Sequence, residues 1–361
     1  MPNKTRDYSL LGPNASLAVE NGLAAAEWYH TDVSRKEMKA LMKRSDALAI
    51  RDTAIWLGLM VVFAGIGIAL WPSWWSAPFW LAYGVLYGSA ADSRWHECGH
   101  GTAFRTGWMN DVVYQIASFM MIRNPVTWRW QHARHHTDTI IVGRDPEIVV
   151  MRPPAIWRIF ANIFGLVDAW NGWTRLLLNA SGKLESQEET FIPNSEHPKV
   201  IRVARIWVMI YGATLTTALA TNSLLPVMLV VLPRLYGAWH HVMCGVLQHA
   251  GLADNVIDHR LNSRTVYMNP ISRFIYWNMN YHVEHHMFPM VPFHRLPELH
   301  DLIKHDLPAP NTSIWQAYRE LIPVLFRQLA REDHFLIRYL PETAKPYRVD
   351  FHEGALGSPA E

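Results

Sequence analysis

Cysteine is scarce in this sequence, which has only Cys98 and Cys244 among 361 residues. Two thiols are too few for a disulfide framework, a four-cysteine zinc site or a cysteine-ligated iron–sulfur cluster. Charged residues are also few, because they make up 18% of the chain against about 25% in typical soluble domains. The net charge is only +2 and no long basic run is present, so we expect no binding to nucleic acid.

Apolar residues, by contrast, make up 50% of the chain and include 17 Trp, which is typical of a membrane protein with a substantial polar part. About 20 apolar residues cross a bilayer as a helix, and four segments are candidate spans. They lie at about 53–71, 78–91, 203–221 and 224–247. The connections at 71–78 and 221–223 are short and uncharged, which predicts two helical hairpins.

The distribution of lysine and arginine predicts the orientation of these spans. Basic residues precede the first span and follow the second, whereas the two hairpin tips have none. Because cytoplasmic loops carry the excess of positive charge, both termini and residues 91–202 are expected on the cytoplasmic side. Within that stretch, residues 156–178 mix aromatic and charged side chains. They predict either interfacial amphipathic helices or a half-buried helix of a soluble cap.

We therefore expect an all-α integral membrane protein with about four transmembrane helices in two hairpins and a helical cytosolic cap. A cytoplasmic N-terminal segment would cover residues 1–46, and the membrane domain with its cap residues 47–300. A C-terminal extension of the cap and a tail would cover residues 301–361. No secretory signal peptide is expected, because the first fifty residues are polar and charged.

The chain has 19 histidines, and eight of them fall into three compact clusters. Residues three and four apart share one face of a helix, so each cluster projects its imidazoles together. Imidazole is the commonest metal ligand and suits Fe, Zn, Cu or Ni. Eight ligands exceed what one ion can use, so the pattern predicts two ions. The clusters are His96/His100, His132/His135/His136 and His282/His285/His286, and His249 is a ninth candidate.

The first cluster also supports a different function. His96, Glu97 and His100 match H-E-x-x-H, in which two histidines bind zinc and the glutamate acts as the general base of a metalloprotease. This alternative explains two histidines and leaves six without a role. A transporter or a metal-binding membrane module is a third possibility, because histidines alone do not establish catalysis.

Taken together, the clusters HECGH, HARHH and HVEHH resemble the histidine boxes of the membrane fatty-acid desaturase and hydroxylase superfamily. The pairs Gln248-His249 and Asn280-Tyr281, and the triplet Asp145-Pro146-Glu147, are similar to that family as well. The resemblance extends from about residue 47 to residue 297.

The resemblance implies a four-helix membrane stalk under a cytosolic cap that holds two iron ions. These irons would use O₂ as co-substrate to remove hydrogen from an unactivated C–H bond, giving an alkene, or an alcohol by hydroxylation. We expect desaturation of a fatty acyl chain. The implied iron ligands are His96, His100, His132, His135, His136, His249, His282, His285 and His286.

Two features modify this expectation. Residues 248–289 are also similar to bacterial relatives implicated in the oxidation of small polar compounds, such as those of rhizopine catabolism. A small polar or amine-containing substrate is therefore an alternative to an acyl chain. The chain has no flavin motif, haem motif or cysteine cluster, so electrons should come from a ferredoxin- or rubredoxin-like protein and its reductase. We expect this donor to dock near Arg123, Arg129 and Arg134, and the enzyme to lie in a bacterial inner membrane.

Three further side chains are candidates for the site. Glu97 and Glu284 lie inside the histidine boxes and could accept hydrogen bonds from the ring N–H groups of metal ligands. Arg234 lies inside the fourth apolar segment, where a buried charge is expensive. It would either bind an anionic group of the substrate or pair with an acidic residue of the cap.

Overall fold

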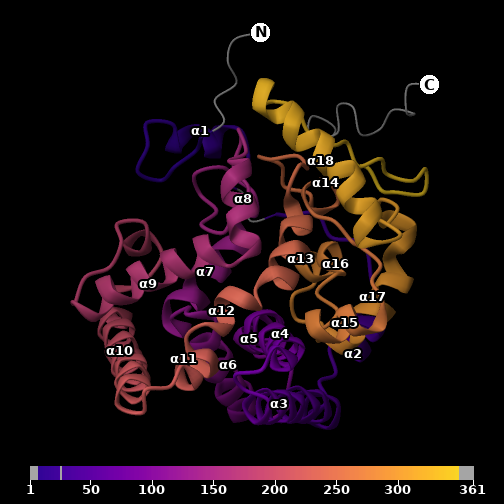
Figure 1. The fold of residues 1–361 in the computed structure, drawn as a ribbon. Helices are drawn as coiled ribbons and strands as arrows, with labels where there is room; N and C mark the ends of the chain where they lie inside the picture. The colour runs from indigo at the N-terminus through magenta and orange to yellow at the C-terminus, as the bar shows by residue number, and fades with distance from the viewer. Residues whose placement is uncertain (1–6, 25–26, 349–361) are drawn as a thin grey trace.

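The computed structural model describes residues 7–24 and 27–348. Within these ranges the chain is helical, and its β pairing is limited to two isolated bridges, Thr265–Tyr281 and Val266–Asn311. The expected all-α class is thus confirmed for the described residues. The end of the predicted C-terminal tail, residues 349–361, lies outside them. Figure 1 shows the long helices α3 and α10 at one side of the molecule and the C-terminal helices at the other.

The first predicted hairpin is formed by α3 (Asp46–Ala69) and the helical path that follows it. The Ser45 hydroxyl accepts a hydrogen bond from the Leu48 N–H and caps α3. The return path runs through α4 (Ala77–Val85), a π-helical turn (Leu86–Ala90) and α5 (Ala91–Gly99) without a break. The second predicted span therefore continues directly into the first histidine cluster.

The second predicted hairpin has one long helix and one interrupted return. Helix α10 (His197–Ala220) is continuous, but residues 224–247 form α11 (Leu225–Val230), α12 (Pro233–Tyr236) and the start of α13 (Trp239–His249). Proline has no N–H to continue a helical ladder, which accounts for the break before α12. Two helical segments, Arg35–Ala69 and Asn194–Ala220, are long and apolar enough to cross a membrane. Four spanning helices remain a prediction.

Glycines bring the two hairpins into close contact beside the π-helical turn. Gly84 and Gly88 are one turn apart, and a Cβ atom added at Gly237 would lie 1.8 Å from the Gly84 carbonyl oxygen. This small-residue spacing lets helix backbones approach each other. Ser89 then donates a hydrogen bond of 2.6 Å to the Gly237 carbonyl oxygen. The interruption of the fourth segment is thus locked against the first hairpin.

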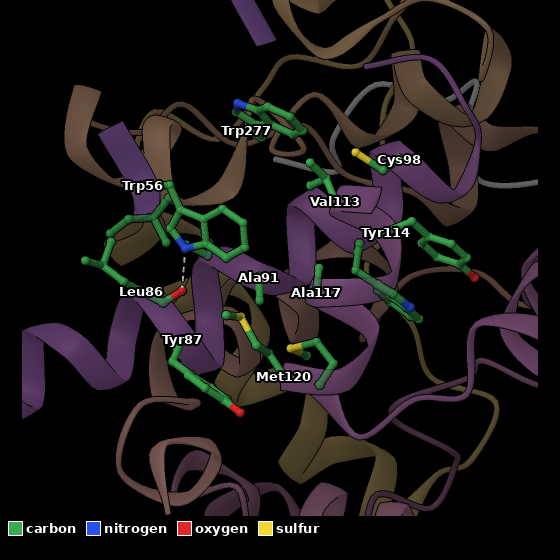
Figure 2. Packing of buried hydrophobic residues seen from close by; sticks show 14 of the residues in the cluster. Trp56, Leu86, Tyr87, Ala91, Cys98, Val113, Tyr114, Ala117, Met120 and Trp277 are labelled. Atoms are coloured by element: carbon green, nitrogen blue, oxygen red, sulfur yellow. Dashed lines mark hydrogen bonds between the residues drawn. The ribbon is translucent and has the colours of Figure 1, made fainter. Parts of the chain in front are cut away.

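The largest apolar core joins α3, the π-helical turn, α5 and α6 (Gly107–Met121). Figure 2 shows Trp56 of α3 donating from its indole nitrogen to the Leu86 carbonyl oxygen, at 2.8 Å. Small residues such as Ala91 and Ala117 leave room for the sulfur and aromatic side chains around them. This packing holds α5, and with it the first histidine cluster, in a rigid frame.

The cap contains α7 (Pro125–Thr137) and the amphipathic pair α8 (Ile156–Ile163) and α9 (Leu166–Ala180). The two helices match the predicted amphipathic segment, and their side chains Trp157 and Trp170 are 70% and 72% exposed. The remaining α-helices of the described residues are α1 (Ala15–Glu20), α2 (Arg35–Leu41), α14 (His259–Asn262), α15 (Pro270–Tyr276), α16 (His282–Met287), α17 (Leu296–Ile303) and α18 (Ile314–Ala330). Short 3₁₀ turns lie at Trp74–Ser76, Glu188–Thr190, Asn194–Glu196, Phe293–Arg295 and Lys304–Asp306.

Candidate metal centre

Each histidine cluster lies at or near the end of a helix that the local sequence defines. The first cluster ends α5 at His100, because Gly101 takes a φ of +71° and its N–H bonds to the Cys98 carbonyl. The second ends α7, which begins where the Asn124 side chain caps the Val126 N–H. The third forms the short helix α16, and His249 is the last residue of α13.

The tertiary structure brings all nine candidate imidazoles together in two groups. Within each group, one ring nitrogen of every histidine lies within 4.8 Å of the corresponding nitrogens of the others. All nine side chains are buried or half-buried. We call them the first group (His96, His100, His132, His136 and His285) and the second group (His135, His249, His282 and His286).

The two groups share the second and third boxes in opposite ways. His132 and His136 belong to the first group, and the intervening His135 belongs to the second. In the third box, His282 and His286 belong to the second group, and His285 to the first. The sequence predicted that each cluster would project its imidazoles together, but the structure divides the histidines of the second and third boxes between the two groups. They are divided because neighbouring residues of a helix point about 100° apart, whereas residues four apart share a face.

The spacing of the ring nitrogens fits metal ligation. In the first group, His132 Nε2 lies 3.0 Å from the Nε2 atoms of both His100 and His136. In the second, His282 Nε2 lies 2.9 Å from that of His249 and 3.0 Å from that of His286. Two nitrogens bound at right angles to one ion, each about 2.1 Å away, would be about 3.0 Å apart.

Ring nitrogens without a hydrogen-bond partner also indicate metal ligation. His96 and His285 are 7% and 0% exposed, and neither ring has a hydrogen-bond partner within the described residues. Buried polar atoms in native proteins are nearly always satisfied, so such rings require another partner. Two ions of the imidazole-binding metals would satisfy them, and the donor set therefore fits a two-metal site.

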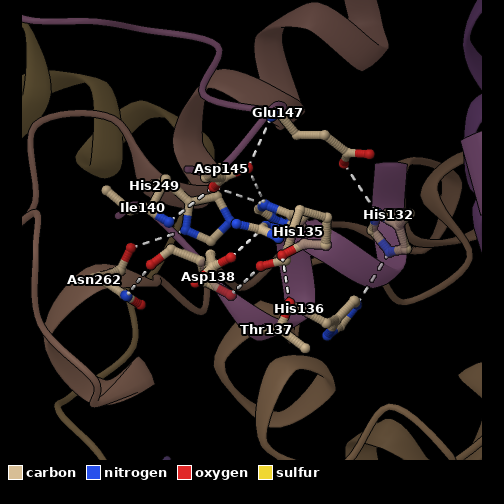
Figure 3. A network of polar contacts seen from close by, with 12 residues as sticks. His132, His135, His136, Thr137, Asp138, Ile140, Asp145, Glu147, His249 and Asn262 are labelled. Atoms are coloured by element: carbon tan, nitrogen blue, oxygen red, sulfur yellow. Dashed lines mark hydrogen bonds and ion pairs between the residues drawn. The ribbon is translucent and has the colours of Figure 1, made fainter. Parts of the chain in front are cut away.

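Carboxylates and a carbonyl oxygen form hydrogen bonds with the Nδ1 atoms of several of these rings, as Figure 3 shows. His135 Nδ1 lies 2.9 Å from Asp145 Oδ2, and His132 Nδ1 lies 2.9 Å from Glu147 Oε2. His249 Nδ1 donates to the Asn262 carbonyl oxygen at 2.8 Å. These contacts turn the Nε2 atoms toward the groups and fix the ring orientation. The sequence showed the Asp145-Pro146-Glu147 triplet only as a family feature, without this role.

Burial and charge set the protonation of the rings. Burial lowers the pKa of His100 to about 4 and that of His249 to about 3, so both are neutral at pH 7. Burial also acts to lower the pKa of His135, but the charge and the hydrogen bond of Asp145 outweigh it and raise this pKa to about 8. A neutral imidazole is the metal-binding form. His135 alone among these three must therefore lose a proton before it can bind a metal at neutral pH.

The hydrogen bonds of the two box glutamates go to residues outside both histidine groups, and their predicted support of the metal ligands stays a prediction. Glu97 accepts hydrogen bonds from the Thr102 hydroxyl, at 2.7 Å, and from the Phe293 N–H, at 3.0 Å. Glu284 accepts from the Thr265 hydroxyl at 2.6 Å and contacts His300.

The position of Glu97 also bears on the metalloprotease alternative. A general base of that class must reach a water on the metal, but both partners of the Glu97 carboxylate lie in the protein core. In addition, His96 and His100 share one group with histidines of the other two boxes. The geometry therefore gives this alternative no support.

Arg234 is 1% exposed and pairs with an acidic residue of the cap, which was one of the two roles predicted for it. It donates to Asp168 at 2.8 Å and to the Gly88 carbonyl oxygen at 3.1 Å. The carbonyl belongs to the π-helical turn, so the arginine also satisfies a backbone group there. These contacts engage Nη1 and Nη2 of the guanidinium, and a role for Arg234 in binding an anionic group of the substrate stays a prediction.

Fold and site together define a helical protein with two buried groups of histidines. The chain matches the Fatty acid desaturase family over residues 69–318, which is more than half of its length. It therefore belongs to this family, whose members are oxidoreductases associated with membranes.

Individual relatives agree with this membership. The chain is 24% identical to an acyl-lipid (9+3)-(E)-desaturase of Dimorphotheca sinuata, over 64% of this chain and 68% of that protein. It is 23% identical to a chloroplastic sn-2 acyl-lipid omega-3 desaturase (ferredoxin) of Arabidopsis thaliana, over 81% and 69%. An omega-6 fatty acid desaturase of Glycine max is 32% identical over 29% of this chain and 30% of its own length. Among such relatives, the chain spans from 30% to 69% of their lengths.

Proposed function

We propose that this protein is a di-iron oxidoreductase that uses O₂ and externally supplied electrons to desaturate a fatty acyl chain. The observation that carries the proposal is the convergence of nine imidazoles into groups of five and four, in a member of the Fatty acid desaturase family. The relatives named as acyl-lipid desaturases support the acyl substrate and favour desaturation over hydroxylation.

The protein's own residues would bind, orient and shield the metal ions. The five rings of the first group would hold one iron and the four of the second the other. When bound, the iron pair would activate O₂ for the removal of hydrogen from an unactivated C–H bond. Asp145 and Glu147 would keep the Nε2 lone pairs of His135 and His132 directed at the ions. A cavity of about 540 Å³ borders both groups and would admit the substrate.

Electrons would come from a separate ferredoxin- or rubredoxin-like protein and its reductase. Both cysteines are buried and distant in sequence, and the Arabidopsis relative is named as a ferredoxin desaturase. In the structure, Arg129 pairs with Asp111 and Arg134 with Asp138, while Arg123 lines the cavity. Docking of the donor near these three arginines stays a proposal.

The location in a membrane rests on the family and on the two apolar helical segments. The relatives compared come from plants and from Caenorhabditis elegans. A bacterial inner membrane is therefore a proposal that rests on the similarity of residues 248–289 to bacterial relatives. The cytoplasmic placement of both termini and the site is a proposal that rests on the lysine and arginine distribution.

A small polar or amine-containing substrate is the second candidate. It is supported by the cavity, whose walls include Asp92, Arg123, Gln131, Asp168 and Asn171. An acyl chain would gain nothing from these polar groups, whereas a polar molecule could form hydrogen bonds with them.

Metal analysis and product analysis test the proposal. Protein purified without oxygen should contain two irons per chain, and His305→Ala, which changes an exposed histidine outside both groups, should retain them. With a reconstituted donor, mass spectrometry should detect new unsaturated acyl chains. One tightly bound zinc per chain would contradict the di-iron proposal. Unchanged lipids with O₂ consumption driven by a small water-soluble compound would select the second candidate.

A further inference from the structure

The cavity beside the histidines places any occupant next to both groups. It lies between α5, α7, α8, α9 and α13 and has a volume of about 540 Å³. His96 and His132 of the first group border it, as do His135, His249 and His282 of the second. The other residues that line the cavity therefore indicate what kind of molecule can lie beside the metal centre.

Helix α9 turns its polar face toward this cavity. Asp168, Asn171, Arg175 and Asn179 line the cavity, and their spacing of three, seven and eleven residues puts them on one face of the helix. The opposite face carries Leu166, Trp170 and Leu177, which are 52%, 72% and 56% exposed. A helix with its apolar face outward and its polar face inward suits lipid outside and a polar occupant inside.

Arg123 and Asp92 also line the cavity and form an ion pair without a hydrogen bond between them. Arg123 Nη1 lies 3.8 Å from Asp92 Oδ1, beyond hydrogen-bond distance. The guanidinium lies over the ring of Trp95, 4.7 Å from its centre, and Trp95 directly precedes His96. Neither of these two charged side chains forms a hydrogen bond with another described residue, although Arg123 is only 38% and Asp92 only 18% exposed.

Two other arginines near this wall, Arg234 and Arg175, are already paired with carboxylates. Arg234 donates to Asp168 at 2.8 Å, and Arg175 donates to Glu185 at 2.7 Å. Arg123 also lies 3.8 Å from Asp168, but that carboxylate is taken by Arg234. Arg158, the remaining arginine of the wall, is exposed and lies over the ring of Trp157. Arg123 and Asp92 therefore form a pair of opposite charges in this wall that a ligand can reach and satisfy.

Charge balance decides which ligand fits this pair. An anion bound to Arg123 alone would compete with Asp92 for the guanidinium. The partly buried Asp92 carboxylate would then lack a counter-charge, which is unfavourable. A cation bound to Asp92 alone would do the same to Arg123. A ligand with both charges satisfies both side chains and leaves the net charge of the cavity unchanged.

We propose that Arg123 and Asp92 recognise a zwitterionic group of the substrate, with anionic oxygens on the Arg123 guanidinium and an ammonium group against Asp92. Asp92 lies one helical turn before His96 on α5, and both side chains line the cavity, so the bond to be oxidised would lie a short distance along the molecule. A free amino-carboxylate and the phosphocholine headgroup of a lipid share this chemistry. The assignment rests on the proposed function in taking the cavity as the substrate site.

Equilibrium dialysis with two labelled probes, glycine betaine and phosphocholine, tests the proposal on the full-length protein in a neutral detergent. The wild type should bind at least one probe saturably, and Arg123→Gln and Asp92→Asn should each weaken that binding by about tenfold or more. Arg123→Lys keeps the charge without the planar fork and should give a smaller loss. Arg129→Gln is the matched control, since Arg129 pairs with Asp111 away from the cavity, and should bind as the wild type does.

The outcomes separate the possible sources and the two proposals. Binding of glycine betaine indicates a small zwitterionic substrate, whereas binding of phosphocholine alone indicates a lipid headgroup. Equal affinities in all variants, or no saturable binding of either probe, overturns the assignment of Arg123 and Asp92. Iron is measured in the same samples. If the protein contains two irons but Arg123→Gln binds the probes as the wild type does, only the proposed zwitterion site is contradicted. If the protein binds a probe but contains no iron, only the di-iron proposal is contradicted.

Discussion

In the first histidine group, the Glu147 carboxylate supports His132, but His96 and His285 have no hydrogen-bond partner within the described residues. In the second group, Asp145 supports His135 and the Asn262 carbonyl oxygen supports His249. The first group thus has more candidate ligands and less support, and the second has fewer ligands and more support. We therefore expect the second group to hold an ion more rigidly than the first.

Loss of one ligand from each group tests this difference most severely. His135→Ala leaves three imidazoles in the second group, and His285→Ala leaves four in the first. Both should reduce turnover by more than the 10–100-fold typical of lost supporting contacts, because a direct ligand is removed. Iron content should fall by about one ion per chain for His135→Ala and by less for His285→Ala. Plasma mass spectrometry after dialysis against a chelator measures this, and a larger iron loss in His285→Ala would refute the comparison.

The supporting carboxylates should give the next largest effect. Asp145 is fully buried, and besides His135 it accepts the N–H groups of Ile140 and Glu147, each at 2.7 Å. Glu147 leaves one oxygen without a partner within the described residues. Asp145→Asn should lower iron affinity by roughly 10–100-fold, and Glu147→Gln should lie at the lower end of that range. Anaerobic iron titrations compare the two, and equal losses would show that the groups are supported alike.

The two groups should also differ in their dependence on pH. The pKa of His135 is raised to about 8, so below pH 8 a proton competes with the metal in the second group. Its iron affinity should therefore rise about tenfold per unit from pH 6.5 to 8 and then level off. The first group should show no such slope, since the pKa of His100 is lowered by burial to about 4. The slope should vanish in Asp145→Asn, and a slope that persists there would assign the proton to another residue.

The smallest effect is expected at Glu97, which reaches neither group. Burial raises the pKa of its carboxyl group to about 7, and its bonded oxygen accepts from Thr102 and Phe293. Glutamine retains an acceptor oxygen, so Glu97→Gln should change activity by no more than about fivefold, equivalent to roughly 1 kcal/mol. Steady-state rates with a fixed donor measure this. Complete loss of turnover with metal retained would restore Glu97 as a general base.

Much of the site could be predicted from the sequence because its geometry is local. Helical spacing places His132 beside His136, and His282 beside His286, whatever the rest of the chain does. The same locality made the segment 156–178 recognisable as the amphipathic helices α8 and α9. The supporting role of Asp145 was not recognisable, because the loop after α7 must fold back before this carboxylate can reach His135.

The sequence by itself determined that this chain is helical, rich in apolar segments and equipped with nine candidate metal ligands. Only the tertiary structure decided how the ligands divide, because His135 and His285 join rings from other helices that lie far away in the sequence. It also decided the partner of Arg234, since a buried charge takes whichever counter-charge packing brings near, here Asp168. Spacing along one helix is fixed by backbone geometry, whereas contacts between helices depend on how the whole chain packs.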